Sequence, residues 1–76
     1  MSRDELEQRE AQALVARGLQ ALDLDKRAVF VMHDIDGCSM PEIAQVVSAP
    51  LNTLYSRLRL ARAEFAAAIR AERGSK

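Results

Sequence analysis

The sequence predicts an all-α fold of four helices. Apolar residues recur every three or four positions, while β-branched residues are few and no run of strand length alternates between apolar and polar residues. Capping residues, glycines and prolines divide the 76 residues into four helical segments. A chain of this length forms one small domain with a modest core, so we expect residues 1–76 to be a single domain.

The first helix is expected over about residues 4–22. Ser2 stands three residues before Glu5, the spacing of a capping box, and apolar side chains follow at helical intervals. Gly18 weakens a helix by about 1 kcal/mol relative to alanine, and a glycine in this place indicates a close crossing with another helix. The expected inward positions are Leu14, Val15, Leu19 and Leu22.

The second helix is expected over about residues 24–35, with Asp23 as its N-cap. Gly37 follows an aspartate and can adopt the left-handed conformation that ends a helix. Its expected core residues are Val29, Phe30 and the run 32–35.

The third and fourth helices are expected over about residues 40–47 and 51–72. Ser39 and Glu42 have the spacing of a second capping box, and the turn at 48–50 ends in a proline that favours the start of a helix. The third helix should place Ile43, Ala44 and Val47 inward. In the fourth helix the expected buried stripe is Leu54, Leu58, Ala61, Phe65 and Ile69.

A short helix, a turn of three residues and a longer helix with a polar face together predict a helix-turn-helix over about residues 39–72. In that motif the N-terminal part of the second helix enters the major groove of DNA and the first helix braces it. Arginine reads guanine, asparagine reads adenine, and serine can bond a base or a phosphate. The side chains expected to contact DNA are therefore Asn52, Tyr55, Ser56, Arg59 and Arg62.

The charge distribution also favours the C-terminal half of the chain as the DNA-binding part. The net charge is zero, which by itself argues against a general nucleic-acid binder. Residues 1–38 carry five basic and eight acidic groups, whereas residues 39–76 carry six basic and three acidic groups. The half with a charge of +3 contains the helix-turn-helix.

The segment at residues 22–62 resembles region 4 of bacterial sigma-70 family sigma factors, especially the extracytoplasmic-function class. It reads LDLDKRAVFVMHDIDGCSMPEIAQVVSAPLNTLYSRLRLAR. The similarity is carried by Leu22 and Arg27 at the entry of the second helix, the turn Asp36-Gly37-Cys38-Ser39, the run Glu42-Ile43-Ala44, and Pro50-x-x-Thr53-x-x-Ser56-Arg57-Leu58-x-x-Ala61-Arg62. The last run is the most specific, because Glu-Ile-Ala occurs in many helix-turn-helix proteins.

The resemblance implies a winged-helix-like DNA-binding fold without a wing. It implies that the last helix binds the −35 element of a promoter, that the domain docks on the flap of the RNA polymerase core, and that an anti-sigma factor covers it in many relatives. This chain departs from the family pattern at Ser48 and Asn52, where glycine is common, and at Tyr55 and Leu60, where basic residues are common. Tyr55 offers a hydroxyl and an apolar ring that could meet a thymine methyl group, so these departures concern the base preference more than the mode of binding.

Several further residues have two possible uses. Thr53 can bond a phosphate or its own backbone, and Asn52 can instead cap its helix. Lys26 and Arg27 are expected to touch the DNA backbone through the family resemblance, with solvated side chains as the alternative. Arg57 is expected to pair with Glu42 and fix the angle between the two helices, with phosphate contact as its second use.

Other function classes fit the sequence less well. The output domain of a two-component regulator also contains Glu-Ile-Ala, but the valine-lysine-x-histidine run that usually follows is missing here. A module that docks on RNA polymerase or an anti-sigma factor, with weak DNA binding of its own, remains open, as does a stand-alone regulator. No region 2 that could melt a −10 element is present, so the chain is either an excised domain or a stand-alone relative.

The sequence gives no indication of an enzyme, a metal site or a cofactor. Cys38 and His33 are the one cysteine and the one histidine, and nothing else suggests a catalytic triad. No apolar run is long enough to span a membrane and the N-terminus is charged, so a cytoplasmic location is expected.

Overall fold

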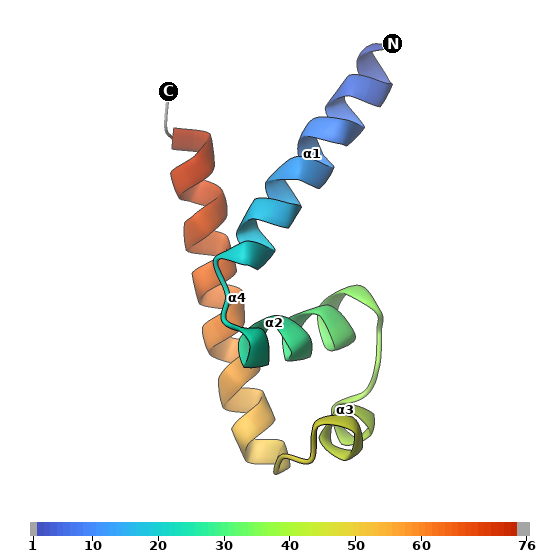
Figure 1. The fold of residues 1–76 in the computed structure, drawn as a ribbon, viewed down its shortest axis with the longest axis vertical. Coiled ribbons are helices and arrows are strands. Elements are labelled where there is room, and N and C mark those ends of the chain that lie inside the picture. Colours follow the sequence, from blue (N-terminus) through green and yellow to red (C-terminus); the bar gives the residue numbers. More distant parts are fainter. Residues whose placement is uncertain (1, 75–76) are drawn as a thin grey trace.

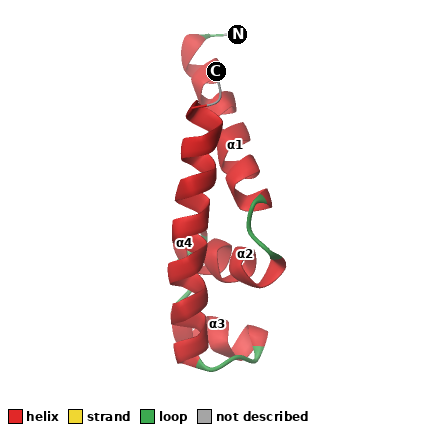
Figure 2. Cartoon of the chain, turned by 90° about the vertical axis from the view of Figure 1, so that its left-hand side faces the viewer, coloured by secondary structure: helices red, strands yellow, loops and turns green. Residues whose placement is uncertain are grey.

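The computed structural model describes residues 2–74 and is entirely helical apart from its turns, which confirms the predicted fold class. The described residues form α1 (Arg3–Gln20), α2 (Leu24–Phe30), η1 (Val31–Ile35), α3 (Met40–Val47) and α4 (Leu51–Gly74). The molecule is elongated, with extents of 44 × 24 × 14 Å, and α4 runs along most of its length (Figure 1). Figure 2 shows α1, α2 and α3 one after another along the same side of α4. No helix of the described residues is both long and apolar enough to cross a membrane.

The predicted caps start three of the helices. Ser2 Oγ accepts a hydrogen bond from Glu5 N at 3.2 Å, and Asp23 Oδ1 accepts one from Lys26 N at 2.9 Å. The capping box of α3 is complete, because Ser39 and Glu42 each accept from the other's backbone N–H. These bonds satisfy N–H groups that have no partner within a helix.

The end of the second predicted helix needs a correction. The α-helix expected over residues 24–35 stops at Phe30 and continues as the π-helix η1, in which Asp36 N donates to Val31 O at 2.9 Å. A π-turn contains an additional residue, so the side chains that follow it change direction. Ile35, predicted to be in the core, is 53% exposed as a result.

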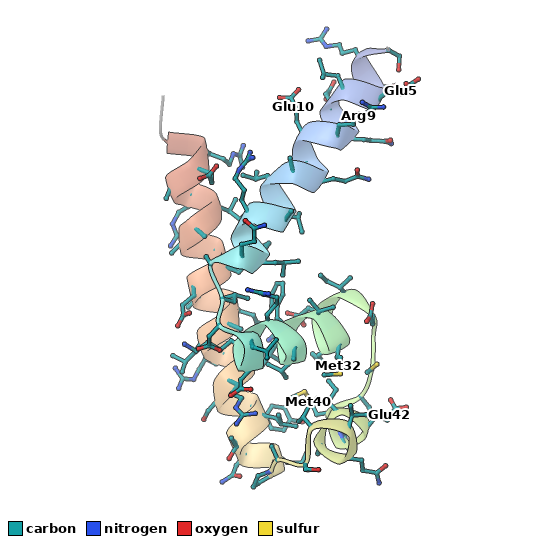
Figure 3. The ribbon with its side chains drawn as sticks, viewed as in Figure 1. Glu5, Arg9, Glu10, Met32, Met40 and Glu42 are labelled. Atoms are coloured by element: carbon teal, nitrogen blue, oxygen red, sulfur yellow. The ribbon has the colours of Figure 1, made fainter. Side chains whose placement is uncertain are left out.

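The core lies where α2, α3 and the first half of α4 meet. Ile43 and Leu54 are fully buried, and the ring of Phe30 packs on that of Phe65 with centroids 4.7 Å apart. Met40 is buried and Met32 packs against the same cluster (Figure 3). The buried residues are Leu22, Val29, Phe30, Met40, Ile43, Leu54, Leu58 and Ala61.

α1 meets the rest of the domain only near its C-terminal end. The expected close crossing is confirmed at Gly18, which is buried against Phe65 and Ile69 of α4. Beyond this point the two helices diverge (Figure 1), and residues 3–13 are all exposed. Val15, predicted to be inward, is 39% exposed, whereas its neighbour Leu14 is half-buried.

Candidate nucleic-acid interface

The turn between α3 and α4 sets the geometry of the helix-turn-helix. α3 ends at Val47 and α4 begins at Leu51, as the sequence predicts. Ser48 closes α3 in the left-handed conformation, with φ 55° and ψ 48°, and its backbone N–H donates to Ala44 O. Glycine adopts this conformation without steric cost, which explains why glycine is common here in the family that the sequence resembles.

The first three turns of α4 expose a polar face. Asn52, Tyr55, Ser56 and Arg59 all lie on the surface, on the side of α4 opposite to Leu54 and Leu58. Tyr55 is 56% exposed, and Arg59 makes no ion pair with any described residue. The face therefore offers a guanidinium, a phenol, an amide and a hydroxyl within two to three turns of a helix.

The N-terminal end of α4 has acceptors for two of its first backbone N–H groups. Asn52 Oδ1 accepts from Thr53 N at 2.9 Å, so this amide already helps to cap the helix, as the alternative reading of Asn52 expected. Leu54 N donates to Pro50 O at 3.1 Å. Thr53 is half-buried, which leaves Asn52 as the more accessible side chain of the two.

The structure does not contain the predicted pair between Glu42 and Arg57. Glu42 Oε1 accepts from Ser39 N at 2.8 Å, so its carboxylate faces its own helix start, and this bond lowers the pKa of Glu42. The half-buried Arg57 instead lies on the side of α4 toward the start of α2. The pKa of Asp23 is lowered mainly by the hydrogen bond from the backbone of Lys26, and the charge of Arg57 lowers it further.

Lys26 and Arg27, expected at the DNA backbone, both have partners inside the domain. Lys26 Nζ lies 2.7 Å from a carboxylate oxygen of Glu64, and this hydrogen bond raises the pKa of Lys26. Arg27 donates from Nε to Leu19 O at 3.0 Å and from Nη2 to Leu22 O at 2.9 Å. Arg27 thereby satisfies carbonyls at the C-terminal end of α1 and ties α1 to α2.

Arg62 is also engaged, on the other flank of α4. Its Nε and Nη2 donate to the two carboxylate oxygens of Asp34 in η1, at 2.8 and 2.7 Å. The hydrogen bonds from Arg62 lower the pKa of Asp34 and raise that of Arg62. Both ends of the segment α2–η1 are therefore bonded to the middle of α4. Lys26, at the start of the segment, pairs with Glu64, and Asp34, at its end, pairs with Arg62.

Sequence reasoning missed these tertiary bonds. Glu64, Asp34 and the carbonyl groups of Leu19 and Leu22 lie 38, 28, 8 and 5 residues from their partners. Opposite charges on different helices were visible in the sequence, but nothing local indicates which of them meet.

Two other features of the chain lie away from this face. His33 Nδ1 lies 2.9 Å from Cys38 O, so the histidine bonds the backbone of the turn. Residues 2–74 contain no group of three or more histidine, cysteine or carboxylate side chains that could hold a metal ion.

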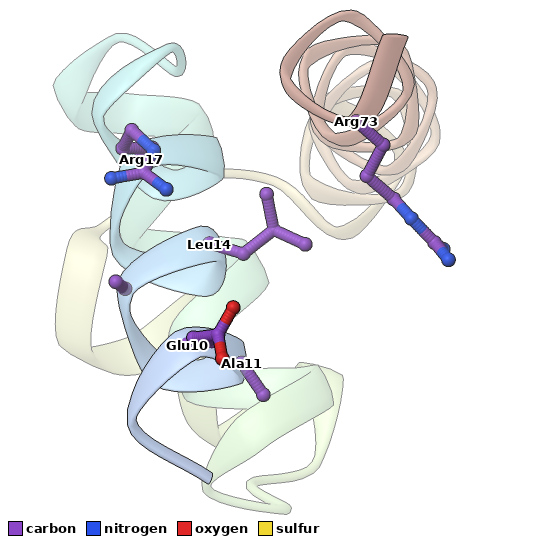
Figure 4. Close-up of a pocket in the computed structure, with 6 residues that line it drawn as sticks. Glu10, Ala11, Leu14, Arg17 and Arg73 are labelled. Atoms are coloured by element: carbon purple, nitrogen blue, oxygen red, sulfur yellow. The ribbon is translucent and has the colours of Figure 1, made fainter. Parts of the chain in front are cut away.

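A cavity of about 440 Å³ opens between the diverging parts of α1 and α4. Leu14 projects toward α4 from α1, and Arg73 lines the cavity from α4 with its guanidinium directed away from Leu14 (Figure 4). Arg17, at its edge, forms an ion pair with Glu72. Because the cavity lies at the opposite end of α4 from Asn52, it does not belong to the helix-turn-helix face.

The comparison with known families agrees with the geometry of α3 and α4. The model of the family described as Sigma-70, region 4 matches residues 12–65, which include the C-terminal half of α1, all of α2, η1 and α3, and the first 15 residues of α4. No curated protein and no solved structure gives a significant match.

Proposed function

Because the chain belongs to the sigma-70 region 4 family, we propose that it binds duplex promoter DNA at the −35 element and so directs transcription initiation. The first turns of α4 enter the major groove, and α3 supports them from the side. RNA polymerase core, through its flap, is the expected protein partner. The run from Pro50 to Arg62 favours the extracytoplasmic-function type of sigma factor.

One observation carries this proposal: the side chains suited to read bases are exposed together at the N-terminal end of α4. Arg59 is free to donate bidentately to guanine, and Tyr55 presents a flat ring suited to a thymine methyl group. Ser56 and Asn52 lie beside them. A recognition helix uses this end of its length, and the buried stripe behind it keeps the helix rigid.

Phosphate contacts would position this face. Because Thr53 N and Leu54 N already donate to Asn52 and Pro50, a phosphate oxygen would accept from the N–H groups ahead of them, at Leu51 and Asn52. Thr53 and Arg57 flank this end and are proposed as further backbone contacts. Arg57 is available for this role because Glu42 does not engage it.

A second candidate is a module that works mainly through protein partners and binds DNA weakly. The pairing of Lys26 with Glu64 and of Arg62 with Asp34 supports it, since two of the cations expected to contact DNA already face carboxylates. The overall charge of zero also favours this candidate, because it gives the domain no general attraction to DNA. The partners would be RNA polymerase or an anti-sigma factor, and this role is compatible with DNA binding inside a larger complex.

Fluorescence anisotropy of the 76-residue chain on duplex DNA carrying a randomised −35-like segment tests the proposal. Selective binding should weaken as salt rises, with a slope of roughly −0.9 per neutralised phosphate in a plot of log affinity against log salt. Duplexes enriched over several rounds of selection should share a common core of bases. Binding that stays undetectable at low salt would overturn DNA recognition by the isolated domain and favour the second candidate.

A further inference from the structure

We propose that Asp34 masks Arg62 from the DNA backbone and thereby limits the affinity of this domain for DNA. The inference rests on the proposed function, and it adds an internal competitor for one of the cations at the interface. Asp34 belongs to η1, outside the helix-turn-helix, and sequence reasoning had given it no role in binding.

Both carboxylate oxygens of Asp34 accept a hydrogen bond from Arg62. Arg62 donates two parallel hydrogen bonds of 2.8 and 2.7 Å to the two oxygens of Asp34. Arginine binds phosphate through the same bidentate arrangement, so the carboxylate occupies the donors that a phosphate would use. The side chain of Arg62 is still 53% exposed, which means that solvent and DNA can reach it.

The position of Arg62 makes it relevant to the interface. It follows Arg59 by three residues on α4, so the two arginines lie one turn apart on adjoining faces of the helix. Arg59 extends from the exposed face, whereas Arg62 lies on the flank that meets η1. A DNA strand beside Arg59 would pass within reach of a side chain as long as that of Arg62.

The π-helix is what places the carboxylate there. Because η1 is wound with hydrogen bonds over five residues, Asp34 faces α4 while its neighbour Ile35 is exposed. Asp34 is the more enclosed partner, with 23% of its side chain exposed. The carboxylate of Asp34 therefore stays beside α4. There its negative charge repels an approaching phosphate, and its oxygens accept the hydrogen bonds of Arg62.

The test compares Asp34→Asn with Asp36→Asn in the 76-residue chain. Both substitutions remove one negative charge, but Asp36 is exposed and forms no ion pair with a described residue. Asparagine can keep one hydrogen bond to Arg62, and an exposed pair adds little to stability, so the fold should persist. Circular dichroism and a thermal melt check that both variants remain helical.

The probe is the same −35-like duplex, measured by anisotropy over a series of salt concentrations. Asp34→Asn should bind about two- to fivefold more tightly than Asp36→Asn at low salt, the range expected from the strength of an exposed ion pair. Its salt dependence should steepen by about one phosphate contact, a change of roughly 0.9 in slope. Arg62→Ala should cost little in the wild type and should abolish the gain in the Asp34→Asn background.

The outcomes separate this inference from the proposed function. If the wild type binds DNA and the two aspartate variants are equal, masking is wrong and DNA binding stands. If Asp34→Asn binds more weakly than Asp36→Asn, Asp34 orients Arg62 toward DNA, which also overturns masking. If no variant binds at low salt, both proposals fail, whereas binding by Asp34→Asn alone supports both.

Discussion

Gly18 of α1 and Phe65 of α4 pack so closely that a Cβ atom on residue 18 would lie 2.6 Å from Cε1 of the ring. The same atom would lie 3.0 Å from Cδ1 of Ile69. The ring of Phe65 is itself held by Phe30, so it cannot easily move aside. The position of α1 against α4 thus depends on residue 18 being glycine, which has no side chain.

We expect Gly18→Ala to destabilise the domain although alanine is the better helix former. Alanine gains up to about 1 kcal/mol in helix propensity, whereas overpacking a filled site costs about 1–3 kcal/mol. A net loss of about 1 kcal/mol corresponds to a fall in Tm of roughly 4–8 °C for a domain of this size. Gly74→Ala is the control, because a Cβ there meets no atom within 4 Å, and an equal fall in both variants would contradict the packing argument.

Ser48→Gly should stabilise the domain by about 0.5–1 kcal/mol. The left-handed conformation costs a residue with a side chain roughly 1–2 kcal/mol, and the additional freedom of glycine in the unfolded chain offsets part of that gain. Ser48 has φ 55°, so the strain is removed without any change of backbone. Urea titration measures the difference, and Ser48→Ala, which keeps the strain, should show no such gain.

Arg59→Ala should weaken binding to a −35-like duplex by about 1–3 kcal/mol if the guanidinium contacts a base. Stability should not change, because Arg59 is exposed and makes no ion pair among the described residues. Arg70→Ala is the matched control, since Arg70 is also an exposed arginine of α4 but lies three turns farther along. Equal losses in the two variants, measured by anisotropy, would mean that Arg59 acts only through general charge.

Stability should fall in acid through Asp34 and Glu42. The hydrogen bonds from Arg62 lower the pKa of Asp34 below its ordinary value of 3.8, and the backbone N–H of Ser39 lowers that of Glu42 below 4.5. Groups whose pKa is lower in the folded state stabilise it fully above their unfolded values and lose this effect as the pH falls through the folded values. Urea midpoints should therefore be flat above about pH 5 and decline below pH 4.

Comparison of the wild type with Asp34→Asn isolates one part of this decline. The variant has no carboxylate to protonate at position 34, so its urea midpoint should depend less on pH below 4. Identical acid profiles for the two proteins would show that the pair with Arg62 does not stabilise the fold in solution.

Local sequence signals sufficed for the helices, the caps and the turn at residues 48–50. Caps and turns depend on neighbours within three or four residues, and those neighbours can be read directly from the chain. The π-helix could not be predicted, because a change of winding at Val31 leaves the apolar pattern almost unaltered. The expected pair of Glu42 with Arg57 does not form. The carboxylate of Glu42 instead accepts a hydrogen bond from the backbone N–H of Ser39, which is only three residues away in the same capping box.

In the candidate interface, too, some features could be predicted from the sequence and others could not. The exposure of Tyr55, Ser56 and Arg59 follows from helical periodicity, which the sequence contains. The partners of Lys26 and Arg62 follow from how α2 and η1 cross α4, which depends on the packing of the whole core.

The exposed N-terminal half of α1 also implies that the domain is unevenly protected. Glu5, Arg9 and Glu10 project from a part of the helix that no other described element covers (Figure 3). A helical stretch of about ten residues without tertiary contacts is marginal in water, so it should open and close many times while the core stays closed. Amide hydrogens there should exchange with deuterium at nearly the rate of an unfolded peptide. Those in the last turn of α1, where Gly18 is buried against α4, should exchange far more slowly, so this single helix of 18 residues should span a wide range of exchange rates.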